Sequence, residues 1–389
     1  MYLLMAVLLG ILFYFGNILL PFSGINIPVF YIEIVALALT LFFLIKTKRV
    51  VIDKFTVVIF CLIIIHTVTL FTTEDFVRAF EGVKTYIFLI VIYYSIKSFL
   101  ETLNSKKIFK FIVAFEFCFF FFTFFKIIEI VISNNLYLTK TFYMYKSYFS
   151  LPFGNSNYIA QIMLFFTVAF FISALNNRRF FYFLLFTMGI TSLFLLNSRS
   201  AILSLIITLL IYFTTSVKKL RFNIKTSVVF IIVVVSLFLV GRQSVFFTLA
   251  LERFKFENGN ISSRLNQYND IINYIINSGI VKFLIGNGMG TETSILNSLL
   301  IHNIILKVIF SIGILGFLSY VIYYYFFLSD ILSISKEDTE VKKYLYSIIA
   351  LGISSLVEPV LYTSFIEYFL VMYLAFVSTL KRKKALVVS

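Results

Sequence analysis

The sequence predicts an all-α membrane protein that crosses the bilayer about twelve times. Of its 389 residues, 61% are hydrophobic and only 13% are charged, whereas soluble domains carry about 25% charged residues. Apolar runs of 17 or more residues recur along the whole chain. Each run is long enough to cross about 30 Å of hydrocarbon as a helix. A soluble enzyme is therefore excluded.

The apolar runs place the predicted spans at 2–20, 28–45, 55–71, 83–97, 111–132, 158–175, 180–196, 201–215, 226–241, 299–327, 344–360 and 364–380. The first run lacks a basic leading segment and a small-residue cleavage site, so we interpret it as a retained helix rather than a signal peptide. Cys61 and Cys118 lie inside predicted spans and are interpreted as small buried hydrophobic side chains. We expect one transmembrane domain, 1–389, with an external loop subdomain at 242–298.

The positive charges sort to alternate loops. Six loops, at 46–54, 97–110, 178–179, 218–225, 336–343 and 381–384, hold 21 of the 33 Lys and Arg residues. By the positive-inside rule these loops are cytoplasmic, which places both termini in the cytoplasm and agrees with an even number of spans. The net charge of +15 is then explained by orientation signals and contacts with anionic lipid headgroups. A nucleic-acid partner is unnecessary.

Two predicted external loops are longer than turns, at 133–157 and 241–298. Within the second, Ile261 to Asn277 carries apolar residues at helical spacing, namely Ile261, Leu265, Tyr268, Ile272 and Ile275. This spacing predicts an amphipathic helix, with Gly279 in the C-cap position, on the membrane surface or over the helix bundle. The segment 285–290 follows and is interpreted as a flexible turn, because no strand precedes it as in a dinucleotide-binding motif.

Three polar residues are hard to explain by structure alone. Arg199 lies in a loop of about four residues between two spans, where it could reach headgroups or face the protein interior. His302 begins a long apolar run, and Arg264 lies on the predicted amphipathic helix, where a solvated position is the alternative. His66 is better explained as a neutral core imidazole. By the predicted topology Arg199, Arg264 and His302 all lie on the external side.

These residue types suggest a particular chemistry. The predicted external carboxylates form no Asp-x-Asp pair, which is the usual means of holding Mg²⁺ on a pyrophosphate. Guanidinium groups can bind phosphate oxygens instead, because they stay charged and bind bidentately. An imidazole can accept a proton from an attacking hydroxyl.

The order of motifs resembles the O-antigen ligase and polymerase family, the Wzy- and WaaL-like glycosyltransferases of bacterial surface polysaccharides. Five segments between about 150 and 320 carry the resemblance: Phe153–Asn157 with Ile159-Ala160, Asn197–Ile202, Ser263-Arg264 with Tyr268, Gly286–Gly290, and His302-Asn303 with Gly313–Gly316. The first 130 residues contribute only hydropathy.

The resemblance implies a GT-C-like, metal-independent transferase with no cofactor. The donor would be a polyprenyl-pyrophosphate-linked oligosaccharide, and the acceptor a sugar hydroxyl. Arg199 and Arg264 would hold the donor pyrophosphate, while His302 would act as the base. Asn155, Asn157, Tyr268 and Asn303 are the expected substrate-binding residues. The site would face the outside of the bacterial plasma membrane, and a chain-length regulator protein is a candidate partner.

Three other functions stay open. A ligase would transfer the glycan to a different acceptor; we favour the polymerase because ligase-like chains often carry a larger external domain. A lipid-linked oligosaccharide flippase would also have twelve spans, and Lys126 and Glu129 could pair inside one of them. However, the chain has only 4 prolines and no visible repeat, which disfavours a rocking transporter. A non-catalytic scaffold would leave Arg199, Arg264 and His302 unexplained.

Overall fold

The computed structural model of the protein describes residues 2–15, 17–22, 25–47, 52–136, 148–149, 156–177, 180–216, 258–296, 301–335 and 338–388. The chain divides into two compact units. Unit 1 comprises Met1–Phe119, Asn258–Val341 and Ser355–Ser389, and unit 2 comprises Phe120–Glu257 and Lys342–Ser354. Each unit is described separately below.

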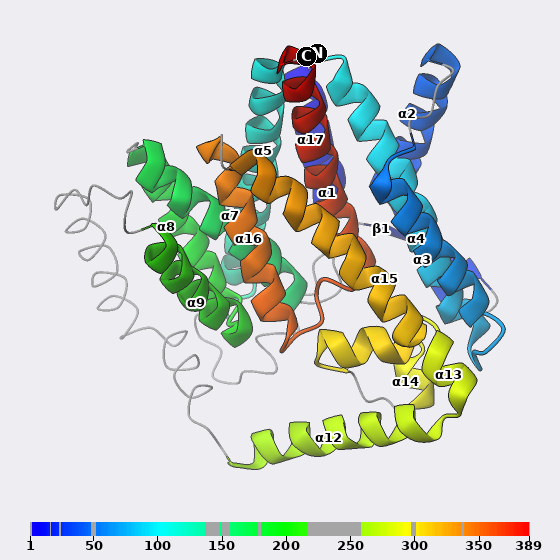
Figure 1. Ribbon diagram of the computed structural model, residues 1–389. Coiled ribbons are helices and arrows are strands. Elements are labelled where there is room, and N and C mark those ends of the chain that lie inside the picture. The colour runs from blue at the N-terminus through cyan, green and yellow to red at the C-terminus, as the bar shows by residue number, and fades with distance from the viewer. Residues whose placement is uncertain are drawn as a thin grey trace. The chain divides into compact units, whose positions relative to one another are not determined.

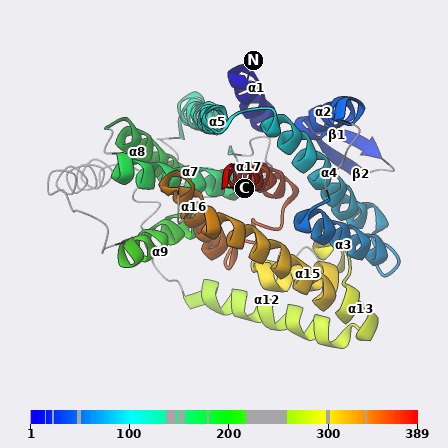
Figure 2. The same ribbon diagram turned by 45° about the horizontal axis from the view of Figure 1, so that its top comes forward.

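Unit 1 is a helical bundle with one small β-hairpin. Its elements are α1 (Tyr2–Phe15), β1 (Asn17–Phe22), β2 (Ile25–Phe30), α2 (Tyr31–Thr47), α3 (Lys54–Thr69), α4 (Phe76–Glu101), the first half of α5 (Ser105–Ser133), α12 (Asn258–Asn277), α13 (Ile280–Ile285), α14 (Glu292–Ile295), α15 (Ile304–Ser335) and α17 (Ser364–Val388). The start of α1 and the end of α17 lie at one end of the unit, and α12 to α14 lie at the opposite end (Figure 1). There α12 crosses beside the first turns of α15 (Figures 1 and 2).

Aromatic rings fill the core of unit 1 where α1, α5 and α17 meet. The ring of Phe13 lies 5.8 Å from those of Phe115 and Phe365, and 5.9 Å from that of Phe119. Nearby, the buried carboxylate of Glu33 is bound by Lys84 at 3.3 Å and by the Tyr368 hydroxyl at 2.6 Å. A buried charge requires such partners, because transfer from water without them is costly.

Unit 2 contains the second half of α5, α7 (Ser156–Asn177), α8 (Phe180–Leu195), α9 (Arg199–Ser216) and most of α16 (Thr339–Ser355). The helix α7 is its centre and is buried over most of its length. Ser347 of α16 donates a hydrogen bond to the Phe165 carbonyl at 2.9 Å, and the predicted Lys126–Glu129 pair is present at 2.8 Å.

Among the described residues, five helices are long and apolar enough to cross a membrane: α4, α5, α7, α15 and α17. Five shorter apolar helices are α1, α2, α3, α8 and α9. Together they coincide with ten of the predicted spans, so the chain is a multi-pass membrane protein built from helices. The predicted span 226–241 lies outside the described residues, and the span count of twelve stays a prediction.

Two details differ from the sequence prediction. The first helix ends at Phe15 instead of residue 20, and an antiparallel hairpin follows in which Leu19 pairs with Pro28. Pro21 and Pro28 explain the difference, because proline interrupts helices and is tolerated on edge strands. Cys61 is exposed on α3 rather than buried, so it faces away from the bundle.

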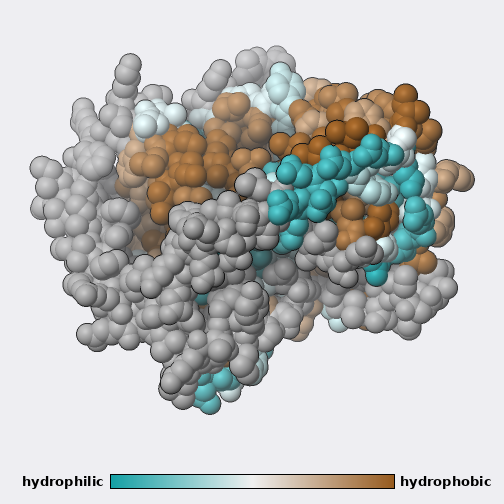
Figure 3. All heavy atoms as spheres, turned by 90° about the horizontal axis from the view of Figure 1, so that it is seen from below, coloured by the Kyte–Doolittle hydropathy of each residue, from teal (hydrophilic) through white to brown (hydrophobic). Residues whose placement is uncertain are grey.

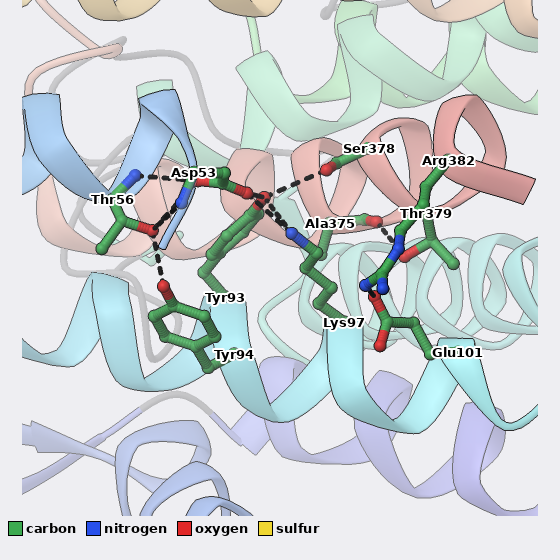
Figure 4. A network of polar contacts seen from close by, with 10 residues as sticks. All are labelled: Asp53, Thr56, Tyr93, Tyr94, Lys97, Glu101, Ala375, Ser378, Thr379 and Arg382. Atoms are coloured by element: carbon green, nitrogen blue, oxygen red, sulfur yellow. Dashed lines mark hydrogen bonds and ion pairs between the residues drawn. The ribbon is translucent and has the colours of Figure 1, made fainter. Parts of the chain in front are cut away.

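A polar network joins the start of α3 to the C-terminal parts of α4 and α17 (Figure 4). Asp53 caps α3 and binds Lys97 of α4 at 2.7 Å, and Arg382 of α17 binds Glu101 at 2.7 Å. Burial raises the pKa of Asp53, but hydrogen bonds from Lys97, Tyr93 and the backbone of Thr56, with the charge of Lys97, bring it below its ordinary value. The network therefore fixes helix ends through charges that were predicted to face lipid headgroups.

Candidate functional site

His302 lies directly before α15, where the chain enters the bundle. The preceding Ile301 is buried in an apolar cluster with Ile271 and Ile275 of α12 and Phe310 of α15. The following Asn303 caps the helix, because its Oδ1 accepts hydrogen bonds from the backbone N–H of Ile305 at 2.9 Å and Leu306 at 3.1 Å. Asparagine is a preferred residue for this role. The histidine is therefore held between an apolar anchor and a helix cap.

Glu358 faces the imidazole of His302. Its Oε2 lies 3.4 Å from His302 Nδ1, and the two side chains are 17% and 28% exposed. Two further contacts hold this arrangement: Asn303 Nδ2 donates to the Leu356 carbonyl at 3.0 Å, and the Tyr268 hydroxyl donates to the His302 carbonyl at 3.4 Å. A carboxylate at one ring nitrogen orients an imidazole and favours Nε2 as the nitrogen that can accept a proton.

A buried ion pair lies one turn further along α15. Lys307 Nζ contacts Glu292 Oε1 of α14 at 2.9 Å, and both side chains are nearly buried. Burial raises the pKa of Glu292, but the charge and hydrogen bond of Lys307, together with a backbone hydrogen bond and the charge of Arg78, lower it below the ordinary value. Arg78 of α4 also contacts Asp75 at 3.3 Å and the Thr293 hydroxyl. These contacts fix α14 beside the site.

The glycine-rich segment 286–290 is bound to a break in α15. Gly313 has a φ of 65° and interrupts the helix. The Asn287 N–H donates to the Phe310 carbonyl at 2.9 Å, and the Gly288 N–H donates to the Ser311 carbonyl at 2.7 Å. We call these two hydrogen bonds the backbone clamp. The segment is therefore an ordered contact with α15 rather than the flexible turn that the sequence suggested.

The predicted amphipathic helix is confirmed as α12, although its buried face is shifted. Ile271 and Ile275 are buried, and the Tyr274 ring lies 5.5 Å from that of Phe310. Ile272, which was expected on the buried stripe, is exposed. Tyr268, Ile271 and Ile275, at a spacing of three and four, form the side that meets α15. The buried face is therefore shifted by about one residue from the predicted one.

In unit 2, Arg199 and Asn157 lie at the same end of their two helices. Arg199 is the first residue of α9, only three residues separate it from the end of α8, and Asn197 among these three has a φ of 50°. Gln161, one turn after Asn157 on α7, donates to the Ser200 hydroxyl at 3.4 Å. Asn197 and Ser198 are buried while Arg199 is half-buried. The tight turn thus places Arg199 at the start of α9.

The structure brings together Tyr268, His302 and Asn303 in unit 1. Arg264 lies on α12 one turn before Tyr268, but its side chain lies outside the described residues, as does all of Asn155. Arg199 and Asn157 belong to unit 2, so their placement beside His302 stays a prediction. Within the described part of the chain, no group of three or more His, Cys, Asp or Glu side chains could hold a metal ion.

Sequence reasoning missed Glu358. It was placed inside the predicted span 344–360, whereas the structure ends α16 at Ser355 and leaves Glu358 in the turn before α17. The signal that could have identified it is the charge itself, because an ionisable residue in an apolar segment is a candidate functional residue. Its partner could not have been named, since His302 lies 56 positions earlier.

In a comparison with protein families, residues 181–321 match the model of a family described as O-antigen ligase. The matched segment contains Arg199, Arg264, Tyr268, His302 and Asn303, and it includes the clamp and the break at Gly313. Asn155 and Asn157 precede it. No curated protein and no solved structure matched the chain.

Proposed function

Because residues 181–321 carry an O-antigen ligase domain, which confirms the predicted resemblance to the ligase and polymerase family, we propose that this multi-pass membrane protein is an oligosaccharide repeat-unit polymerase. It joins polyprenyl-pyrophosphate-linked repeat units of a bacterial surface polysaccharide. The observation that carries this proposal is the pairing of His302 with Glu358 just before α15. His302 lies inside the matched segment, whereas Glu358 lies beyond its end.

In the proposed reaction the acceptor hydroxyl attacks the anomeric carbon of the donor glycan. His302 accepts the hydroxyl proton at Nε2, and Glu358 holds the ring through Nδ1. The bond between the anomeric carbon and the phosphate oxygen breaks, and its electron pair leaves with the polyprenyl pyrophosphate. General base catalysis of this kind contributes about 10²- to 10⁴-fold to a rate.

The departing pyrophosphate needs positive charge, which we assign to Arg199 and Arg264. Stabilising the developing charge is usually the largest catalytic contribution. Two guanidinium groups can do this without a metal ion, so the proposed reaction is metal-independent and needs no cofactor.

Asn155, Asn157, Tyr268 and Asn303 are proposed to contact the substrate. Two of them also form hydrogen bonds within the protein, since Tyr268 binds the His302 carbonyl and Asn303 uses both ends of its amide. These two residues therefore also position the base. We propose that the site faces outward from the bacterial plasma membrane, with both termini cytoplasmic, and that a chain-length regulator protein is a partner.

Two alternatives give different products. A ligase of the same family would transfer finished glycan to a different acceptor, and a flippase would move the lipid-linked unit across the membrane without chemistry. The Glu33–Lys84 pair inside the bundle favours neither alternative, because both charges are held by partners within the protein.

The experiment that tests the proposal is a surface-glycan ladder from a host that lacks its own polymerase. The host is complemented with the wild-type chain, with His302→Ala, or with Asn269→Ala, an exposed change on α12 that serves as the control. We expect a ladder from the wild type and the control, and its loss with His302→Ala at equal protein levels. A ladder that is indifferent to His302 contradicts the proposed base.

The same host separates the alternatives. Long chains that form without this protein and stay on the lipid carrier would identify a ligase. A repeat unit that never reaches the outer face without the protein would identify a flippase.

A further inference from the structure

Exposed apolar side chains gather where α12 ends and α13 begins. None of the six residues of α13 is buried, and Ile280 is 75% exposed. The patch, called the α13 patch below, consists of Ile272, Ile276, Ile280, Val281, Phe283 and Leu284. Contiguous exposed apolar surface on a protein marks an interaction site.

The patch is fixed in place by the backbone on its other side. A Cβ at Gly286 would lie 2.5 Å from the backbone of Ser311, and a Cβ at Gly313 would lie 2.3 Å from that of Leu284. Helix α13 therefore packs on α15 with its backbone in close contact, and the clamp holds its C-terminal end. The Thr72 hydroxyl donates to the Gly286 carbonyl at 2.9 Å, which joins the same end to the turn that follows α3. The apolar side chains consequently point away from the bundle.

The patch continues an apolar surface that already faces outward. On α3 the exposed residues Val57, Phe60, Ile64 and Val68 follow one another at three and four positions, and Phe71 just beyond the helix is 86% exposed. On α15, a membrane-spanning helix by length and composition, Leu315 and Leu318 are exposed in the same way. Since α13 lies against both helices, its apolar side chains extend this outward surface to the end of the unit.

Hydrophilic side chains adjoin the α13 patch. Seen from the end that carries α12, a hydrophilic band lies next to hydrophobic surface (Figure 3). Asn269, Asp270 and Asn273 of α12 are exposed, while Lys282 of α13 binds Glu74 at 3.0 Å. A hydrogen bond from Lys282 to Glu74 raises the pKa of Lys282, so its charge persists beside the apolar patch. An apolar face flanked by lysine and amides is typical of segments at the membrane interface.

We propose that the α13 patch is embedded in the bilayer and contacts lipid acyl chains at the level just below the headgroups. The loop 242–298 then contains a membrane-inserted turn where α12 ends and α13 begins, and α12 lies along the interface beside it. This inference does not depend on the proposed enzymatic function.

The sequence contains no tryptophan, which allows a direct test. Phe283→Trp and Ile280→Trp each create a single-tryptophan protein with the probe in the patch. Phe60→Trp places the probe on the outward face of α3, and Asn269→Trp places it among the exposed polar side chains of α12. All four full-length variants are reconstituted into vesicles of phosphatidylcholine, with and without bromine on the acyl chains, and bromine quenches tryptophan that contacts lipid.

We expect the two patch probes to lose emission in brominated vesicles to an extent similar to the Phe60 probe, and to emit at shorter wavelength than the Asn269 probe. Bromine near the headgroup should quench the patch probes more than bromine near the chain end. Equal quenching of the patch and Asn269 probes contradicts the proposal. Access of aqueous iodide to the patch would show that it faces water, and protection from both quenchers would show that protein covers it; either result overturns the inference.

Discussion

His302 contacts Glu358 through Nδ1, so the orientation of the imidazole depends on a residue 56 positions further along the chain. The segments that carry the two residues are joined a second time, because Asn303 Nδ2 donates a hydrogen bond to the Leu356 carbonyl. Together these contacts hold the turn that carries Glu358 beside His302. The quality of the proposed base therefore depends on the turn that carries Glu358, as well as on the histidine.

Replacement of Glu358 tests this dependence. We expect Glu358→Ala to lower kcat for glycan transfer by about tenfold or more, because the base loses its orientation, with little change in KM. Glu358→Gln retains an oxygen that can accept from Nδ1 and should restore part of kcat. Steady-state transfer assays on purified protein measure both constants. If the alanine variant raised KM and left kcat unchanged, Glu358 would bind substrate instead of positioning His302.

The Glu292–Lys307 pair supports the site by charge. Because both partners are nearly buried, Glu292→Gln leaves the lysine without its counter-ion and should lower stability by about 3 kcal/mol. Replacing both residues with apolar ones, Glu292→Leu with Lys307→Met, should be much less costly. Thermal unfolding of the three proteins in one detergent gives the comparison. Equal losses in the single and double variants would show that the unpaired lysine charge is not what destabilises Glu292→Gln.

The same pair predicts a pH dependence. The pKa of folded Glu292 lies below its ordinary value, so its contribution to stability is present above the ordinary carboxyl range. It is lost as the pH falls through the lower, folded value. Between neutral pH and about pH 3, we expect the wild type to lose more thermal stability than Glu292→Gln, which lacks this carboxylate. Parallel pH profiles would show that Glu292 does not titrate in this way.

At the scale of elements, the break in α15 and the clamp belong together. A helix interrupted at Gly313 leaves carbonyls of the preceding turn without helical partners, and Asn287 and Gly288 supply N–H donors to two of them. Tyr274 of α12 donates to Asn287 Oδ1 at 3.1 Å, which extends the same contact to α12. The loop subdomain is therefore docked on the half of α15 that follows His302.

Gly313→Ala should disrupt this docking. The new Cβ would meet the Leu284 backbone at 2.3 Å while Gly313 keeps a positive φ, so we expect a loss of about 3 kcal/mol from overpacking and strain. Gly352→Ala in α16 is the control, because its Cβ would have no neighbour within 4 Å. That variant should gain up to about 1 kcal/mol. Thermal unfolding and hydrogen exchange in 280–296 would detect the difference, and equal behaviour would argue against the clamp.

Sequence reasoning performed unequally on these elements. Hydropathy located most helices because one apolar run is enough to identify a span, and periodicity located α12. The break at Gly313, the clamp and the Glu358 contact could not be predicted, since each depends on groups far apart in the chain. The hairpin at 17–30 was missed because its apolar residues also satisfy a hydropathy window. Arg264 and Asn155 stay predictions, as their side chains are outside the part described.

At the scale of the whole molecule, the basic loops have two roles. The terminal run 381–384 was predicted to orient the chain and contact lipid, yet Lys381 binds Asp330 at 2.6 Å and Arg382 binds Glu101. Lys54 shares Asp330 at 2.7 Å. Positive charge at this end of unit 1 thus also ties helices together. Its excess over acidic residues still favours a cytoplasmic location.

The opposite ends of unit 1 provide a test of orientation. The chain termini lie at one end and α12 at the other (Figure 1). If the helices of unit 1 span the bilayer, we expect the two ends to lie on different sides of the membrane. In a background without Cys61 and Cys118, Asn269→Cys and Lys384→Cys place one thiol at each end. We expect a membrane-impermeant maleimide to label Asn269→Cys in intact cells or spheroplasts, and to label Lys384→Cys only after lysis. Labelling of Lys384→Cys alone in intact cells would invert the topology and remove His302 from the external face. Labelling of both would show that the two ends do not lie on opposite sides of the membrane.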